Sequence, residues 1–162
     1  MASSAIRLAT SEDAGAIHAM ILGIGAVLGQ AHKIAGTVED IRRWGFGPDP
    51  AFEALIAEEG GRPVGLCLYF RSFSTWRGRP GAYVQDLYVD PACRGGGWGR
   101  RLLAACAARS AETGGAYIRL SVDAANIAAQ GFYARAGFRH AADDLIHQID
   151  GEDFQRLAGE VD

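Results

Sequence analysis

The sequence has few cysteines and few histidines, and neither residue type is spaced to bind a metal. The three cysteines, Cys67, Cys93 and Cys106, are odd in number and include no Cys-x-x-Cys pair, so the pattern indicates neither a disulfide framework nor a zinc site. The four histidines also lack metal-ligand spacing, and we predict no metal. Reduced thiols are typical of the cytoplasm, which is where we expect the protein.

The sequence also lacks two features that mark membrane and nucleic-acid partners, a long hydrophobic run and an excess of basic residues. Residues 14–28 are apolar, but they are short for a bilayer span, contain His18 and three glycines, and follow no basic leader. We interpret them as a buried helix that loosens near Gly23 and Gly25, and predict no membrane partner. The net charge of −3 argues against nucleic acid as a partner.

The length and composition of the chain predict a single domain over residues 1–162, because a chain of this length that is 49% hydrophobic has enough apolar side chains for one core. Thr10 with Asp13, and Thr37 with Asp40, are capping-box patterns that begin two helices, the second running through Trp44. Turn residues and apolar alternation predict the remaining elements. These are a strand at 5–9, a hairpin at 51–70, a strand at 82–90, a helix at 99–113, a strand at 117–122, a helix at 126–137, a last strand near 138–149 and a short tail helix. The order predicts an α/β fold whose mixed, mostly antiparallel sheet contains one parallel β-α-β unit and has flanking helices.

The segment DLYVDPACRGGGWGRRLL, residues 86–103, combines a strand, a glycine-rich loop and the start of a helix. Glycines before a helix let a ligand approach the backbone and leave N–H groups pointing outward, which makes a phosphate cradle. Arg100 and Arg101 fall in the first helical turn, where the macrodipole disfavours cations and an anion would compensate. The loop lacks the Lys-Ser/Thr of a Walker motif and the GxGxxG spacing of a dinucleotide site, so another phosphate ligand is indicated.

Two motifs stand here in a distinctive order. They are Arg94-x-x-Gly97-x-Gly99 after the strand QDLYV, and Asn126-x-x-Ala129-x-x-Phe132-Tyr133 followed by Gly137-Phe138. The first resembles the acyl-coenzyme A pyrophosphate loop of the GCN5-related N-acetyltransferase (GNAT) family, and the second is similar to a later segment of that family. The stretches GFGPDPAFEALIAE and STWRGRPGAYVQDLYV further resemble the diamine, polyamine and thialysine N-acetyltransferase branch, so the resemblance spans about residues 6–138.

The resemblance implies an N-acetyltransferase that passes the acetyl group of acetyl-CoA directly to a primary amine of a small molecule in a ternary complex, and that forms a homodimer. It implies a set of cofactor-binding residues: Leu87, Tyr88, Val89, Arg94, Gly95, Gly96, Gly97, Trp98, Gly99, Arg100, Asn126, Phe132 and Tyr133. A backbone N–H between Leu87 and Val89 would polarise the thioester carbonyl. Asn126 fits either a helix cap or a contact to the pantetheine arm.

Tyr133 is, by the same resemblance, the general acid that protonates the departing thiolate. On a helix its side chain diverges by roughly 100° from that of Phe132, so the two cannot both point into the core. A buried tyrosine with a satisfied hydroxyl is the structural alternative.

The sequence leaves several alternatives for the residue that acts on the amine acceptor. Alternation places Tyr83, Gln85, Leu87 and Val89 on one face of the strand and Val84, Asp86 and Tyr88 on the other. Gln85 stands where polyamine-type relatives carry Glu, and an amide cannot take a proton from an ammonium. Asp86 is the nearest carboxylate but is expected on the opposite face; a water chain, or binding of the neutral amine without a base, is equally open. The catalytic candidates are therefore Tyr133, Gln85 and Asp86.

Other charged groups have simpler interpretations. We expect surface or packing roles for the histidines, with His32 of GQAHKI nearest the acceptor loop of relatives. Arg71, Arg77 and Arg79 read as a solvated rim that would repel polycations if it lined the entrance. Acetylation of an amino acid, an antibiotic or a protein amine stays open, as does a non-catalytic CoA-binding regulatory domain.

Overall fold

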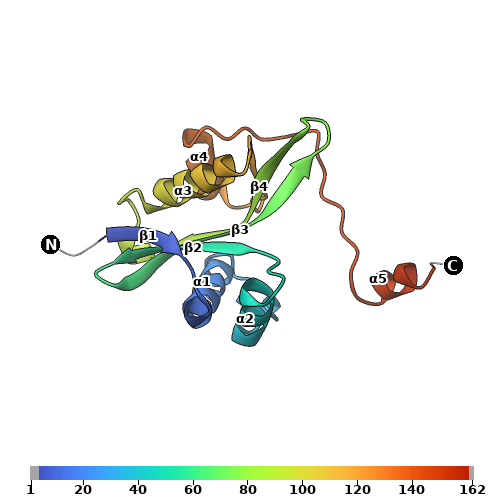
Figure 1. The fold of residues 1–162 in the computed structure, drawn as a ribbon, viewed down its shortest axis with the longest axis horizontal. Helices are drawn as coiled ribbons and strands as arrows, with labels where there is room; N and C mark the ends of the chain where they lie inside the picture. Colours follow the sequence, from blue (N-terminus) through green and yellow to red (C-terminus); the bar gives the residue numbers. More distant parts are fainter. Residues whose placement is uncertain (1–3, 161–162) are drawn as a thin grey trace. The chain divides into compact units, whose positions relative to one another are not determined.

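The computed structural model describes residues 4–160, which fall into two compact units, residues 4–126 and 127–160. The first unit holds a five-stranded sheet in the order β1-β2-β3-β4-β5 (Figure 1). Its strands are β1 Ser4–Leu8, β2 Glu53–Glu59, β3 Arg62–Ser74, β4 Arg79–Val89 and β5 Ile118–Leu120. The first four pair antiparallel, and β5 pairs parallel with β4, so the predicted mixed α/β fold is confirmed. That the whole chain is one domain stays a prediction.

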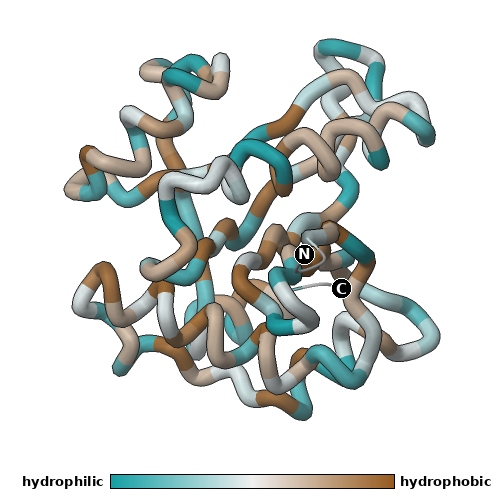
Figure 2. Tube along the Cα trace, turned by 90° about the vertical axis from the view of Figure 1, so that its left-hand side faces the viewer, coloured by the Kyte–Doolittle hydropathy of each residue, from teal (hydrophilic) through white to brown (hydrophobic). Residues whose placement is uncertain are grey.

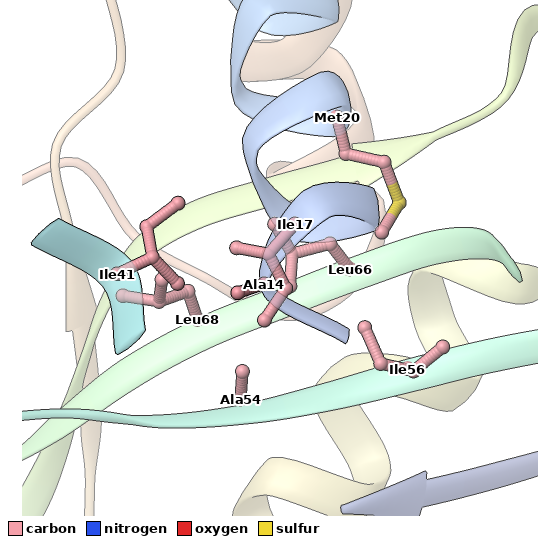
Figure 3. Close-up of a cluster of buried hydrophobic side chains, with 8 residues drawn as sticks. All are labelled: Ala14, Ile17, Met20, Ile41, Ala54, Ile56, Leu66 and Leu68. Carbon is pink, nitrogen blue, oxygen red and sulfur yellow. The ribbon is translucent and has the colours of Figure 1, made fainter. Parts of the chain in front are cut away.

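Helices cover both faces of this sheet. Helices α1 (Ala14–Val27) and α2 (Val38–Phe46) lie on one face and α3 (Trp98–Glu112) on the other (Figure 1). Short 3-10 helices occupy Ser11–Asp13, Ala31–Lys33 and Pro91–Cys93. The core under α1 and α2, shown in Figure 3, consists of Ala14, Ile17, Met20, Ile41, Ala54, Ile56, Leu66 and Leu68. Neighbouring residues on β2 and β3 point the other way, so Leu55 and Cys67 are buried on the α3 face.

The helix starts follow from the capping boxes. Thr37 Oγ1 accepts a hydrogen bond from the Asp40 N–H at 3.2 Å, and the Asp40 carboxylate accepts one from the Thr37 N–H at 2.8 Å. Asp13 likewise accepts from the Thr10 N–H at 2.7 Å, and it is also held by Arg7 of β1 through two contacts of 2.8 Å. This ion pair lowers the pKa of the Asp13 carboxyl. The first helix is thereby fixed to the edge of the sheet.

The prediction that the first helix loosens near Gly23 and Gly25 is wrong. Helix α1 is continuous, and both glycines are places of close approach. A Cβ at Gly23 would lie 2.8 Å from the Tyr88 ring, and one at Gly25 would lie 2.9 Å from the Cα of Ala31. The glycines therefore let α1 pack tightly against β4 and against the loop that follows the helix.

The second unit contains α4 (Ile127–Arg135) and α5 (Gly151–Ala158). The strand predicted near residues 138–149 is not formed, so that prediction is wrong for this segment. Its apolar residues Leu145, Ile146 and Ile149 are 50–79% exposed, and a strand needs a neighbouring edge to satisfy its backbone. Along the described residues, apolar (brown) and polar (teal) positions alternate over short distances (Figure 2), and every helix is too short or too polar to cross a bilayer.

Candidate functional site

Strand β4 carries an irregularity that changes which side chains share a face. Asp86 pairs with Leu68 of β3, but the next pair is Val84 with Tyr69, so Gln85 is an extra, unpaired residue. Because of this β-bulge, Tyr83 and Asp86 lie on the α1 face while Val84 lies on the α3 face. The predicted strict alternation from Tyr83 to Val89 is therefore wrong: the extra residue reverses the facing of the side chains that precede it.

The edge of β4 toward β5 is largely open. Within the described residues, β5 pairs only with Ala82, Tyr83 and Val84 of β4. Beyond the bulge, residues 85–89 have no strand partner on this side within the described residues. The Asp90 N–H donates to Val64 of β3, so by alternation the N–H groups of Leu87 and Val89 face outward. An extended chain with amide groups can hydrogen-bond along such an edge in the manner of an added strand.

The glycine-rich loop continues directly from this open edge. Gly95 and Gly97 have φ of 82° and 78°, values that residues with a Cβ adopt only at a cost, and a Cβ on either would meet no atom within 4 Å. The loop therefore consists of exposed backbone over a free space. Arg94 is oriented by its own strand, because its Nε donates to the Val89 carbonyl at 3.1 Å.

One contact that fixes the loop was not predicted from the sequence. Asp90 accepts from the Ala92 N–H at 2.9 Å and from the Arg62 guanidinium at 2.9 Å. Both contacts lower the pKa of the Asp90 carboxyl. The sequence signal was available, since an Asp before a Pro is a common helix start. Its partner Arg62 lies 28 positions earlier and could not be read from local pattern.

Helix α3 begins at the end of the loop, with Gly97 as its N-cap. The first turn has no acidic residue and contains Arg100 and Arg101, as predicted, so its N–H groups and positive dipole end are available to an anion. Trp98 is only 4% exposed and its ring lies under the Arg101 guanidinium at 4.1 Å. A role of Trp98 toward a cofactor would therefore use its backbone N–H rather than its ring.

A hollow of about 390 Å³ lies beside the loop. Its wall includes Arg94, Gly96 and Arg101, together with the Glu59 carboxylate and Cys93. The Cys93 thiol is 3.6 Å from Arg62 and 3.7 Å from Glu59, so it belongs to the network that holds the loop.

Among the residues predicted to act on the acceptor, Asp86 carries the carboxylate. It is half-buried, none of the described residues donates a hydrogen bond to it, and desolvation raises its pKa. Gln85 is exposed at the bulge. In the loop after α1, Gln30 donates a hydrogen bond to the Asp123 carboxylate at 3.3 Å, and His32 is exposed. The catalytic roles of Asp86 and Gln85 stay predictions.

Tyr133 and Phe132 of the second motif lie in a small aromatic cluster. The Tyr133 ring meets Phe132 edge-on at 5.2 Å and Phe138 at 5.5 Å, and all three are half-buried. Asn126 immediately precedes α4, and its N–H donates to the Asp123 carbonyl at 2.9 Å. Its role, as a helix cap or as a contact to the pantetheine arm, stays a prediction.

The remaining candidates have structural surroundings. Arg77 stacks on Tyr117 at 5.1 Å and Arg79 donates to the Gly114 carbonyl at 3.1 Å, and both side chains are exposed, as expected for a solvated rim. Cys67 is buried beside Cys106, and both the contact and burial raise the pKa of Cys67. In the span from Ser4 to Glu160, no group of three or more His, Cys, Asp or Glu side chains is arranged for a metal.

Comparison with known proteins places this geometry in context. Residues 29–138 match the acetyltransferase (GNAT) family. The chain is 33% identical to thialysine N-epsilon-acetyltransferase of Mus musculus over 170 residues, and 34% identical to that of Sus scrofa, with 98% of this chain and 99% of each relative covered. Among solved structures, an aminoglycoside N-acetyltransferase in complex with CoA superposes with a TM-score of 0.74 at 13% identity, covering 92% of this chain and 96% of that one.

Proposed function

The chain belongs to the GNAT acetyltransferase family and is an acetyl-CoA dependent N-acetyltransferase, and from that premise we propose that its acceptor is a primary amine of a small molecule such as a diamine, a polyamine or thialysine. The observation that carries this proposal is one continuous stretch of β4: an open backbone edge leads into the glycine loop, and a half-buried carboxylate lies on the adjoining face. The similarity to thialysine acetyltransferases over nearly the full length supports the choice of a small amine.

The residues present fit acetyl-CoA. Gly95, Gly96, Gly97 and the N-terminus of α3 offer N–H groups to the pyrophosphate, with Arg94 and Arg100 supplying charge. The open edge at Leu87, Tyr88 and Val89 offers amide partners to the pantetheine arm, and one of these N–H groups polarises the thioester carbonyl. When bound, acetyl-CoA supplies the activated acetyl group.

Asp86 acts on the acceptor. An alkyl amine with a pKa near 10 is mostly an ammonium at neutral pH and must lose a proton before it attacks. A half-buried carboxylate with a raised pKa attracts that ammonium and can take its proton, a role that the Gln85 amide cannot fill. Direct transfer in a ternary complex follows, with Tyr133 donating a proton to the departing sulfur.

We further propose that the enzyme is a cytoplasmic homodimer. The three cysteines are free thiols, in accord with a reducing compartment. Six large apolar side chains of the second unit are at least half exposed, as at a surface that a partner covers: Ile127, Leu145, Ile146, Ile149, Phe154 and Leu157. Light scattering after size exclusion tests the dimer, and a mass near 17.2 kDa would contradict it.

An amine panel tests the acceptor. Release of free thiol from acetyl-CoA is followed with diamines, polyamines, thialysine, lysine, an aminoglycoside and a lysine-containing peptide. We expect the highest kcat/KM with a small amine. Higher kcat/KM with the aminoglycoside or the peptide would refute the proposed substrate class.

The variant Asp86→Asn tests the role of the carboxylate. Activity should fall by about 10²-fold, as for loss of a general base, and the acid limb of the kcat/KM profile should disappear with it. Because burial raises the folded-state pKa of Asp86, its ionised form disfavours the fold at neutral pH, so the variant should melt at a higher temperature. Lower activity together with a lower Tm would point to a structural role instead.

A further inference from the structure

The β-bulge has a second effect on the face that carries Asp86. Successive cross-strand pairs on this face are Leu66 with Tyr88, Leu68 with Asp86, and Phe70 with Tyr83. In a regular strand Tyr83 and Asp86, three residues apart, would point to opposite faces. The extra residue Gln85 brings them to the same face, in adjacent positions.

The apolar core ends where this aromatic pair begins. Leu66 and Leu68 belong to the core under α1 (Figure 3), and Tyr88 packs against it. Within the described residues, neither Phe70 nor Tyr83 is part of that cluster or packed on it, and both are half-buried. The two rings therefore continue the face beyond the core without being covered by it.

The two rings are held in a defined arrangement. Their centroids are 5.0 Å apart and their planes differ by 21°, which is a stacked pair. The Tyr83 hydroxyl is 2.7 Å from Ser121 Oγ, which ties the stack to the segment after β5. An apolar surface that is rigid before a ligand arrives loses little entropy when the ligand binds.

The chemistry of this surface matches one part of an alkyl amine. Aromatic faces attract both methylene groups, through burial, and ammonium groups, through the ring quadrupole. The neighbouring Asp86 carboxylate supplies the negative charge, and no described residue occupies it with a hydrogen bond. An amine on an alkyl chain would satisfy both groups at once, whereas a hydroxyl-rich chain would leave its polar groups against the rings.

We propose that Phe70 and Tyr83 are specificity-determining residues for the acceptor, forming the surface on which its alkyl chain lies while its ammonium meets Asp86. This inference rests on the proposed function, because it assumes that the amine binds at Asp86. It assigns a role to Phe70 and Tyr83, which were not among the predicted site residues, and names the property of the acceptor that they recognise, the length of its alkyl chain.

A series of α,ω-diamines from 1,3-diaminopropane to 1,6-diaminohexane tests the inference. In the wild type, each added methylene should lower KM by about two- to fourfold, the range expected for burying a CH₂ group. In Phe70→Ala this dependence should flatten to less than about 1.5-fold per methylene, with KM for acetyl-CoA changed less than twofold. Phe73→Ala is the matched control, because Phe73 lies on the same strand but is 63% exposed, and it should keep the wild-type dependence.

Two further variants guard against a folding defect. Tyr83→Phe keeps the stack and loses only the bond to Ser121, so it should keep the chain-length dependence; Phe70→Leu keeps apolar volume and loses the flat ring, so it should weaken the dependence. If the wild type is active and both Phe70→Ala and Phe70→Leu keep its dependence of KM on chain length, this inference alone is overturned. Absence of thiol release by the wild type with every amine overturns the proposed function as well.

Discussion

Gly97 offers a sharp test of the cofactor loop. It has φ of 78° and ψ of 5°, and a Cβ placed on it meets nothing within 4 Å. The substitution Gly97→Ala therefore creates no clash, and its cost to folding is the conformational strain of the left-handed region, about 1–2 kcal/mol. For a chain of this size that corresponds to a fall in Tm of about 3–6 °C.

A suitable control carries the same strain elsewhere. Gly78, at the tip of the β3–β4 hairpin, has φ of 62° and equally open surroundings. Gly78→Ala should lose similar stability. Gly36→Ala, with open space and no positive φ, should lose little.

Only Gly97→Ala should affect the donor. Its methyl group would stand over the backbone N–H groups proposed to hold the pyrophosphate, and the loss of one charge-assisted hydrogen bond costs about 1.5–3 kcal/mol. KM for acetyl-CoA should then rise about 10- to 100-fold, while Gly78→Ala leaves it unchanged. Steady-state kinetics and thermal melts on the three variants give both quantities. Equal KM values in Gly97→Ala and Gly78→Ala, at equal loss of Tm, would refute the assignment of the loop to the pyrophosphate.

Two further predictions concern catalysis and stability. Tyr133→Phe should lower kcat by roughly 10²-fold with little change in KM for acetyl-CoA, because it removes the proton donor and keeps the ring; unchanged kinetics would remove the assigned acid. Asp13→Asn should cost about 2 kcal/mol at neutral pH, because Arg7 loses one of its two carboxylate partners and keeps only Glu58. Since the folded-state pKa of Asp13 is lowered, this stabilisation is complete above the unfolded value of about 4 and is lost as pH falls through the folded value. Urea melts should therefore show the deficit shrinking in acid, and a pH-independent deficit would contradict it.

Local pattern predicted most of the first unit. The Thr37–Asp40 capping box and the glycine turn before α3 lie where the sequence placed them, because their hydrogen bonds and backbone angles are set by residues a few positions apart. What failed depends on distant partners. Gly23 was predicted to loosen the helix. Its lack of a side chain instead makes room for the ring of Tyr88, which is more than sixty residues away in the sequence.

In the candidate site, too, the features set by nearby residues could be predicted and those set by distant partners could not. The glycine loop is a local motif and was recognised, whereas the bulge at Gln85 arises from how β4 pairs with β3 and leaves no mark in the sequence of β4 alone. One unpaired residue was enough to move Tyr83 to the face of Asp86. The burial of Trp98 also could not be predicted locally, because it results from the packing of α3 on the sheet.

The short pairing between β4 and β5 has a consequence for how the protein behaves between turnovers. An open strand edge is a site where a second chain can attach by mistake, and it also lets backbone amides exchange with solvent. A donor lying along residues 85–89 would close that edge, so the amides of Leu87 and Val89 should exchange hydrogen quickly in the ligand-free enzyme and slowly with coenzyme A present. On this view the donor serves as a temporary member of the sheet.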